Sequence, residues 1–183
     1  SGENISMLLN IKEAYSDKVV LRHIVYVDKI KATNPIKEIN DALYAECKQA
    51  LKACLAYDGV GIAANQIGIQ KSFFLIREDS ESDLFRVYFN PKYKAIGPDK
   101  NTQKEGCLSV PRQQLLVPRF VEIKATWQEI EDAKFVDKEE VLTGFKAIAY
   151  QHERDHLEGL SIIDRTAELN REGKRRMYNE LRG

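Results

Sequence analysis

The sequence predicts an α+β protein of one domain, in which mixed and antiparallel β-sheets pack around a central helix that carries two histidines. Three observations predict this fold. A long amphipathic helix lies near the N-terminus, strand-length apolar or alternating segments come next, and the histidine helix and a last helix close the chain. The 183 residues are 43% hydrophobic, which suits one core of ordinary size, so we expect a single domain over residues 1–183.

Charge and cysteine content narrow the class of function. The formal net charge is zero, which gives no overall attraction to nucleic acid, and we expect no specific DNA binding. No apolar run approaches the length that crosses a bilayer, so we expect no membrane partner. Three cysteines without a signal-peptide pattern favour a reducing compartment. We therefore expect a cytoplasmic location, or an organellar stroma after loss of a transit peptide.

The N-terminal part combines an ambiguous segment with a clear helix. Residues 18–30 mix apolar and charged side chains, which suits a short strand or an extended segment, and His23 is expected to be a surface or hydrogen-bonded residue rather than a ligand. Asn34 and Pro35 are a good N-cap and first helical residue, so we expect a helix from here to about Tyr57. Its buried stripe, in which both cysteines act as small hydrophobes, comprises Ile36, Ile39, Leu43, Cys47, Ala50, Leu51 and Cys54.

A run of small residues, Gly59–Gly68, follows this helix and includes one amide side chain, Gln66. The run lacks both the Lys-Ser/Thr ending and the GxGxxG spacing of phosphate-binding loops. Two interpretations stay open. The run is either a plain turn or a loop that lines a substrate site, with Gln66 as a hydrogen-bond donor.

Strands are expected over Lys71–Ile76 and Leu84–Phe89, which are apolar and aromatic. Asn90-Pro91 is expected to end the second strand, and residues 97–102 to form a loop.

A further strand is expected over Val121–Trp127, where apolar and polar side chains alternate as they do on a half-buried strand. The charged segment after it is expected to contain a hairpin turn near Glu131-Asp132.

Cys107 differs from the other two cysteines. It lies in an expected loop, Glu105–Pro111, beside a glycine and away from any apolar stripe. Thiolate is the reactive and ligating form of cysteine. Three interpretations stay open: an ordinary loop thiol, a nucleophile that needs a histidine as its base, and a metal ligand.

The histidine helix is expected over about Phe145–Leu157. His152 and His156 are spaced i, i+4, which puts both imidazoles on one helical face, where they can bind one transition-metal ion. Glu153 lies beside the first histidine, where a general base for a metal-bound water belongs. Two chance histidines on a surface helix are the alternative. The apolar residues on the same face, which either line a pocket or pack in the core, are Phe145, Ile148 and Ala149.

A metal site needs further ligands. No histidine follows His156, and the downstream carboxylates have no recognisable spacing, so Cys107 is the better third ligand. Cysteine and two histidines leave a fourth position for water, the open geometry of a catalytic site. Such a ligand set accepts zinc, nickel, cobalt or ferrous iron.

A last helix is expected over Ala167–Leu181, with Asp164 or Thr166 as its cap. Residues 165–182 contain six basic and three acidic side chains. A run of this kind is usually a solvated helix face.

Three segments together resemble one known family. The sequences GVGIAANQ, EGCLS and QHERDHLEG occur in the order and spacing of the peptide deformylase motifs GxGLAAxQ, EGCLS and QHExDHLxG. The resemblance covers most of residues 34–165. Because Leu108 stands where a glutamate could be, the chain resembles bacterial or plastid members more than mitochondrial ones. The resemblance implies a hydrolase that removes the N-formyl group from the initiator methionine of newly made polypeptides and releases formate.

The resemblance also implies roles for single residues. Cys107, His152 and His156 would bind the metal, and Glu153 would move the proton. The Gln66 side chain and the Leu108 backbone N–H would hold the oxyanion. The residues implied in substrate binding are Val60, Gly61, Phe145, Ile148 and Ala149. Glu105, Arg119 and Asp155 are implied as an ion-pair group beneath the site.

The implied metal is ferrous iron, for which nickel, cobalt or zinc can substitute. The implied partners are an N-formylmethionyl peptide as substrate and the ribosome, which the basic last helix could dock.

The sequence departs from the family pattern at three further positions. Asn65 stands where proline is frequent, Arg154 where an apolar residue is common, and Gln114 where many bacterial members have arginine.

Two competing functions are also considered. A zinc endopeptidase is disfavoured, because the third ligand lies upstream at Cys107. A deformylase-like protein that binds metal or nascent chains without catalysis is disfavoured, because the motif residues are intact.

Overall fold

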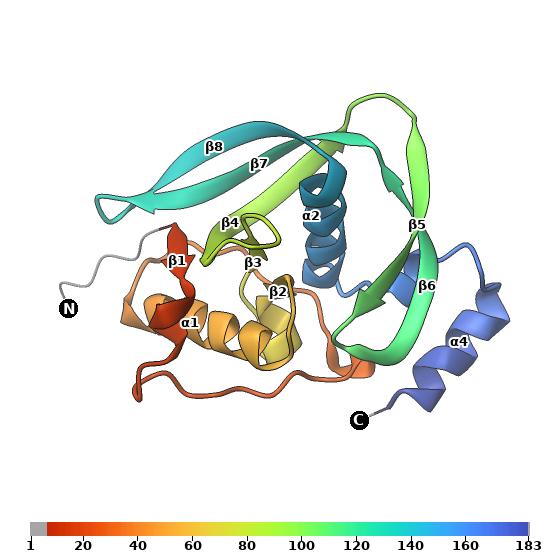
Figure 1. Ribbon diagram of the computed structural model, residues 1–183, viewed down its shortest axis with the longest axis horizontal. Coiled ribbons are helices and arrows are strands. Elements are labelled where there is room, and N and C mark those ends of the chain that lie inside the picture. Colours follow the sequence, from red (N-terminus) through yellow and green to blue (C-terminus); the bar gives the residue numbers. More distant parts are fainter. Residues whose placement is uncertain (1–6, 183) are drawn as a thin grey trace.

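The computed structural model describes residues 7–182 and forms one α+β domain, as the sequence predicts (Figure 1). An antiparallel sheet has the strand order β2-β3-β4-β7-β8, and β1 also pairs with β4. Its strands are β1 Leu8–Asn10, β2 Gly61–Ala63, β3 Phe73–Arg77, β4 Leu84–Ala95, β7 Glu122–Glu131 and β8 Lys134–Thr143. A separate hairpin pairs β5 Lys100–Cys107 with β6 Val110–Phe120.

Helices cover both faces of the larger sheet. The helices of the described chain are α1 Asp41–Ala56, α2 Gly144–Leu157, α3 Ile162–Arg165 and α4 Arg171–Glu180, with short 3-10 turns at Ile11–Ala14, Val27–Lys29 and Ala64–Ile67. Side chains alternate along β3, so that Phe73 packs with the residues of α1 and Phe74 with those of α2. The sheet therefore lies between α1 and α2, and α2 is buried between the sheet and the β5–β6 hairpin (Figure 1).

Tyr150 fixes the depth at which α2 packs on the sheet. Its buried ring makes edge contacts with Phe74 and Tyr88 at centroid distances of 5.0 and 5.3 Å. Its hydroxyl lies 2.9 Å from the carbonyl oxygens of both Lys92 and Thr126. A tyrosine that is apolar at its body and hydrogen-bonded at its tip holds both the position and the rotation of the helix.

The first helix begins later than the sequence predicts. Asn40 is the N-cap, and its side-chain oxygen accepts from the Leu43 N–H at 2.9 Å. Asn34 instead forms a bridge with Lys71, and the Ile36 N–H donates to Asn90 Oδ1 at 2.8 Å. These long-range bonds outweigh the local preference of Asn34-Pro35 for a helix start. The predicted apolar stripe is confirmed from Leu43 onward, and both of its cysteines are fully buried.

Residues 18–30 form an extended segment that contains one 3-10 turn, Val27–Lys29, so the second of the two predicted alternatives for these residues is confirmed. Its backbone N–H groups bind parts of the chain far away in sequence. Val25 donates to the Gln66 carbonyl at 2.8 Å and Val27 to the Ser109 carbonyl at 3.0 Å. His23 is exposed, as expected.

The prediction that Asn90-Pro91 ends this strand, β4, is wrong. The strand continues to Ala95 across a bulge, marked by a register shift between Phe89 and Lys92 and by φ 48° at Asn90. A bulge leaves a residue without a ladder partner, so it tolerates a proline, which has no N–H to donate.

The β5–β6 hairpin takes up part of the two predicted loops, residues 97–102 and Glu105–Pro111. Residues 97–99 and the turn at 108–109 lie outside the strands, as predicted, whereas residues 100–102, 105–107 and 110–111 belong to β5 and β6. The ladder runs from the Lys100–Phe120 pair to the Gly106–Gln114 pair, and Cys107 lies at its end. The first five residues of β5 are exposed, so the strand lacks the apolar alternation that sequence analysis relies on. The other hairpin turn, near Glu131-Asp132, is confirmed.

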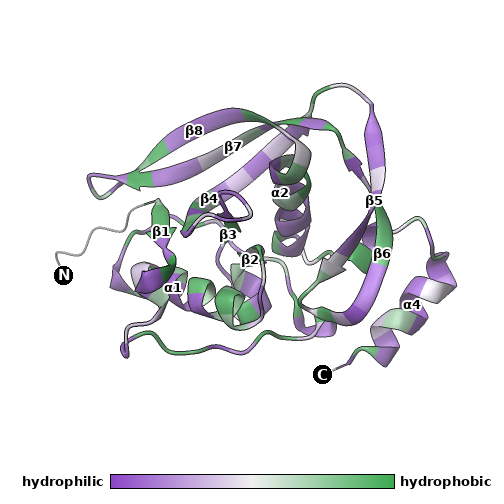
Figure 2. Cartoon of the chain, in the orientation of Figure 1, coloured by the Kyte–Doolittle hydropathy of each residue, from purple (hydrophilic) through white to green (hydrophobic). Residues whose placement is uncertain are grey.

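The C-terminal helix is divided in two, whereas one helix was predicted. Ser161 caps α3, and Asn170 caps α4 by accepting from the Gly173 N–H at 2.8 Å. Thr166 is extended, and Asp164 lies inside α3, so neither caps the last helix. Figure 2 shows that α4 is largely hydrophilic. Among the described helices, none combines the length and the apolar character that crossing a bilayer requires.

Candidate metal centre

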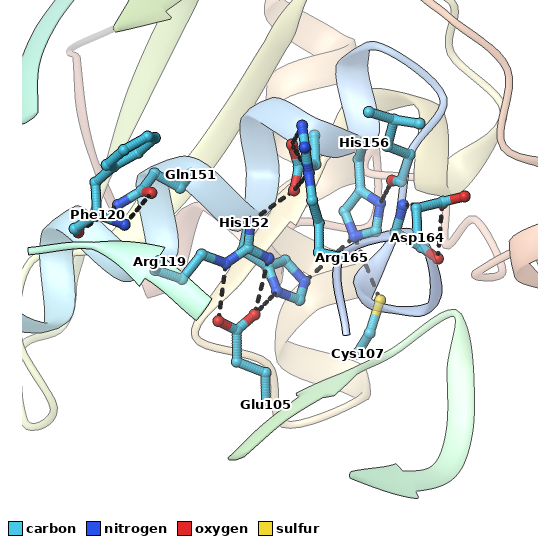
Figure 3. Close-up of polar contacts among 12 residues, drawn as sticks. Glu105, Cys107, Arg119, Phe120, Gln151, His152, His156, Asp164 and Arg165 are labelled. Carbon is cyan, nitrogen blue, oxygen red and sulfur yellow. Dashed lines mark hydrogen bonds and ion pairs between the residues drawn. The ribbon is translucent and has the colours of Figure 1, made fainter. Parts of the chain in front are cut away.

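Three side chains from two elements converge on one point. Cys107 lies at the end of β5, and His152 and His156 lie one turn apart on α2. The His156 Nε2 atom is 3.3 Å from Cys107 Sγ and 3.3 Å from His152 Nε2, and the three ligand atoms all lie within 4.8 Å of one another (Figure 3). The i, i+4 spacing thus places both imidazoles on one inward face of the helix, as predicted.

Each histidine is held through its other ring nitrogen. His152 Nδ1 donates to Glu105 Oε1 at 2.9 Å, and His156 Nδ1 donates to the Leu160 carbonyl at 2.9 Å (Figure 3). Both Nε2 atoms are therefore left to face the thiol, where a metal ion would take the place of a proton. A partner on the second nitrogen is the usual arrangement for histidines that bind a metal.

The predicted ion-pair group lies directly behind His152. Arg119 binds Glu105 through Nε at 2.9 Å and through Nη2 at 3.0 Å, and binds Asp155 through Nη1 at 2.6 Å. All three side chains are buried. Burial alone would raise the pKa of Glu105, but hydrogen bonds from His152 and Arg119 outweigh it and lower this pKa to about 2.

Arg165 joins this group although the sequence did not single it out. It contacts Asp155 through two guanidinium nitrogens, at 3.0 to 3.3 Å, from the end of α3. In the sequence it belongs only to the basic C-terminal run, and no spacing connects it with Asp155. A buried carboxylate that faces two arginines is fully paired.

The donor set fits a transition metal. Burial raises the pKa of the Cys107 thiol, but the neighbouring His156 and His152 outweigh burial and hold this pKa well below its usual range. The sulfur is therefore available as thiolate, the ligating form. A cysteine nucleophile needs only one histidine as its base, whereas here both Nε2 atoms face each other as well as the sulfur. Three ligands of this kind suit an open, catalytic metal site.

Glu153 lies beside these ligands with a free oxygen. The carboxyl is only 5% exposed, and within residues 7–182 its buried Oε1 has no hydrogen-bond partner. Burial raises its pKa. A Cβ at Gly61 would lie 2.8 Å from Glu153 Oε2. Strand β2 therefore passes so close to the Glu153 carboxyl that any residue other than glycine would force one of them to move. Buried polar atoms without a partner are rare in native structures, and a catalytic role is one of the reasons for which they persist.

Gln66 is oriented by two neighbours. Its Oε1 accepts from the Ala63 N–H at 2.9 Å, and its Nε2 donates to Ser109 Oγ at 3.1 Å and lies 3.8 Å from Cys107 Sγ. The run Gly59–Gly68 was predicted to be either a plain turn or a loop that lines a substrate site. It instead forms strand β2 and a 3-10 turn, and the turn directs the Gln66 amide toward the Cys107 thiol. Sequence reasoning missed the role of Ser109, although it lies inside the EGCLS motif.

A cleft of about 860 Å³ opens above these groups. Its walls are β2 with the residues before it, the β5–β6 hairpin, and α2. Val60 and Phe145 are 47% and 46% exposed at its rim. The predicted substrate-binding residues all line it, namely Val60, Gly61, Phe145, Ile148 and Ala149, together with Gln66, Leu108 and Gln114. The volume suits a small ligand or the end of a peptide.

Two departures from the family pattern have clear structural consequences. Asn65 is fully buried, and its Nδ2 donates to the carbonyls of Lys31, at 2.8 Å, and of His156. It thus ties the turn that carries Gln66 to the histidine helix, which a proline could not do. Arg154 pairs with Glu158 at 3.2 Å on a partly exposed side of α2.

Comparisons with known proteins identify the family of this chain. The family model described as polypeptide deformylase matches residues 13–172. A peptide deformylase of Thermotoga petrophila is 36% identical over 141 residues, which is 77% of this chain and 82% of that protein.

Solved structures are similar over most of the chain as well. The crystal structure of peptide deformylase from Thermotoga maritima has a TM-score of 0.70 at 31% identity and covers 81% of this chain and 99% of its own. A structure from Synechococcus elongatus, in complex with actinonin, has a TM-score of 0.75 at 27% identity and covers 94% of this chain and 92% of its own.

Proposed function

Because this chain belongs to the polypeptide deformylase family, a hydrolase family that removes the N-formyl group from newly made polypeptides, we propose how its own residues perform that reaction. The family is metal-dependent, and the enzyme acts in protein biosynthesis, in the processing of the N-terminal methionine. The observation that carries the proposal is the convergence of one thiol and two imidazole nitrogens next to an unpartnered buried carboxyl.

Cys107, His152 and His156 bind the metal in this proposal, and the ion is ferrous iron, for which nickel, cobalt or zinc can substitute. When bound, such an ion polarises the formyl group and makes a water acidic enough to serve as a nucleophile near neutral pH. Glu105 and the Leu160 carbonyl hold the two imidazoles in the required tautomer.

Glu153 moves the proton. Its carboxylate takes a proton from the attacking water as the water oxygen bonds to the formyl carbon. The same carboxyl then gives that proton to the amine nitrogen as the C–N bond breaks. The products are formate and a peptide whose N-terminal methionine has a free amino group. The raised pKa of the buried carboxyl suits a group that must both accept and release a proton.

Gln66 and Leu108 stabilise the charge that develops on the formyl oxygen. The side-chain Nε2 of Gln66 and the backbone N–H of Leu108 donate to this oxygen. Ala63 and Ser109 hold the Gln66 amide in one orientation before substrate arrives. Donors fixed in advance need no reorganisation during the reaction, and each is typically worth about 3 kcal/mol.

The cleft binds the methionine and the start of the peptide. The methionine side chain enters the apolar part formed by Val60, Phe145, Ile148 and Ala149. The Gly61 backbone pairs with the peptide as a strand would, because β2 lies at the end of the larger sheet's strand order and pairs only with β3 among the described strands.

The test is formate release from a short formyl-Met peptide by ferrous-loaded protein prepared without oxygen. The Glu153→Gln variant is the control and should keep the metal but lose turnover. Cleavage by that variant would show that the proton assignment is wrong. Metal-loaded protein that binds the peptide without releasing formate would favour the non-catalytic alternative. Hydrolysis inside an unformylated peptide would favour a zinc endopeptidase.

We also propose that α4 docks the ribosome and that the protein works in the cytoplasm. Support for the first comes from the basic side chains of α4, none of which is buried. A Glu substitution of Arg175 and Arg176 should weaken sedimentation with ribosomes and leave hydrolysis of a short peptide unchanged.

A further inference from the structure

Two basic side chains line the same wall of the cleft. Lys104 lies on β5 and Arg112 on β6, and both are exposed residues of the cleft lining. In the part of the chain that the structure describes, neither forms an ion pair, whereas the arginines beneath the site, Arg119 and Arg165, both do. Two free cations beside a substrate cleft are available for a ligand that carries negative charge.

Arg112 lies in a β-bulge and has a left-handed backbone conformation. The ladder shifts register between Gly106, which pairs with Gln114, and Cys107, which pairs with Val110, so residues 111–113 form a bulge. Arg112 has φ 64°, in the left-handed region that an arginine rarely adopts. Bulges next to active sites re-aim side chains, and strained residues that persist there often serve function.

The remaining charges around the cleft do not cancel this pair. Glu105 is neutralised by Arg119, and Glu153 is buried beneath the opening. Asp58 is exposed, but it belongs to the segment before β2 and not to the hairpin, and it forms no ion pair with either cation within the described residues. The lining residues beside the two cations are Gln103, Gln113 and Gln114, which are uncharged hydrogen-bonding groups. On the β5–β6 wall the Cys107 thiolate faces the two histidines, so Lys104 and Arg112 are left as the charges without a partner in the described part of the chain.

The position of this wall indicates which part of a substrate it meets. Lys104 precedes the ligand Cys107 by three strand residues, which at a rise of about 3.4 Å each is roughly 10 Å along β5. An extended peptide that has its formyl group at the metal centre and runs back along β5 toward Lys104 covers the same distance in about three residues. We propose, on the basis of the proposed function, that Lys104 and Arg112 select nascent chains with an acidic side chain at the third residue.

The test compares three peptides of the form formyl-Met-Ala-X-Ser, with X as Glu, Gln or Lys, on the metal-loaded enzyme. At low ionic strength kcat/KM for the Glu peptide should exceed that for the Lys peptide about fivefold, chiefly through KM, since exposed ion pairs are weak. The ratio should fall toward one as salt is raised, because salt screens exposed charges.

Charge reversal distinguishes the proposed wall from general electrostatics. The double variant Lys104→Glu/Arg112→Glu should invert the Glu-to-Lys ratio. Lys134→Glu, an exposed strand residue outside the cleft lining, should keep the ratio of the unchanged enzyme.

The outcomes separate the two levels of the proposal. If none of the three peptides releases formate, the proposed function itself fails. If the Gln peptide is hydrolysed but the Glu-to-Lys ratio is one, or if the double variant leaves the ratio unchanged, the assignment of Lys104 and Arg112 is overturned.

Discussion

At the scale of single residues, the site depends on atoms held behind the ligands. Glu105 accepts from His152 and is itself held twice by Arg119, which makes it the connection between the imidazole and the buried ion pairs. A ligand set of the same three residues without this support would leave the imidazole free to rotate. Interactions behind a metal ligand are typically worth about 10- to 100-fold in metal affinity.

Glu105→Gln should therefore weaken metal binding by about 10- to 100-fold and lower the free energy of unfolding by about 3 kcal/mol, because Arg119 loses one of its two carboxylate partners. Metal titration and denaturant unfolding of the metal-free protein measure the two effects. Glu139→Gln removes an exposed carboxylate paired with Lys124 and should change neither. Unchanged metal affinity in Glu105→Gln would contradict the positioning role.

Gly61→Ala should lower kcat/KM by at least about tenfold, since its Cβ would lie 2.8 Å from Glu153 Oε2 and 3.2 Å from the Leu75 carbonyl. Steady-state kinetics with a formyl-Met peptide measures this loss. Gly173→Ala, in the exposed helix α4, is the control and should leave turnover unchanged. Normal kinetics in Gly61→Ala would mean that the strand yields without moving the carboxylate.

At the scale of elements, regular hydrophobic patterns were predictive and exposed or long-range structure was not. The stripe of α1, the span of α2 and the turn between β7 and β8 follow from local periodicity and turn-forming residues. The hairpin strand β5 does not, because most of its side chains face water. The start of α1 was placed too early, because the bridge from Asn34 to Lys71 and the bond from Ile36 to Asn90 depend on residues far along the chain.

The same contrast holds within the site. Cys107, His152, His156 and Glu153 belong to motifs in which residue type and spacing imply the chemistry. Ser109 and Arg165 act through contacts across the fold, with Gln66 and Asp155 respectively. Ser109 lies inside the EGCLS motif, but its partner is distant in sequence, and Arg165 lies outside all three motifs.

The hydrogen bonds of the Tyr150 hydroxyl are expected to stabilise the packing of α2 on the sheet. Tyr150→Phe keeps the ring contacts but removes the hydroxyl that faces the Lys92 and Thr126 carbonyls. The loss of a buried hydrogen bond should lower the free energy of unfolding by about 1 to 2 kcal/mol, measured by urea unfolding. Tyr15→Phe, at a tyrosine that is 67% exposed, should have no measurable effect. An equal loss in both variants would contradict the role assigned to Tyr150.

At the scale of the whole molecule, the metal centre adds a further link between two parts that are already joined by the Glu105–His152 hydrogen bond and the Arg119–Asp155 ion pair. Cys107 belongs to the β5–β6 hairpin, and both histidines belong to the helix packed on the larger sheet. A ligand that binds only the folded state stabilises it in proportion to its affinity, by about 4 kcal/mol at a thousandfold excess over Kd.

Removal of the metal by a chelator should therefore lower the melting temperature by several degrees, followed by circular dichroism with and without added ferrous iron. In Cys107→Ala the chelator should have little effect, since the proposed site is incomplete. A wild-type protein whose melting temperature does not respond to chelator would contradict a metal bound between the two parts.

The extended N-terminal segment has a consequence for the order in which the protein is made. Its amides are held by groups synthesised later: Val25 by Gln66, Val27 by Ser109, and Thr33 by the Leu157 carbonyl at 2.9 Å. A ribosome adds residues from the N-terminus onward, so this segment waits unpaired while about 120 further residues emerge before the last of these bonds can form. The enzyme that processes nascent chains thus completes its own active site only after the whole of α2 has been synthesised.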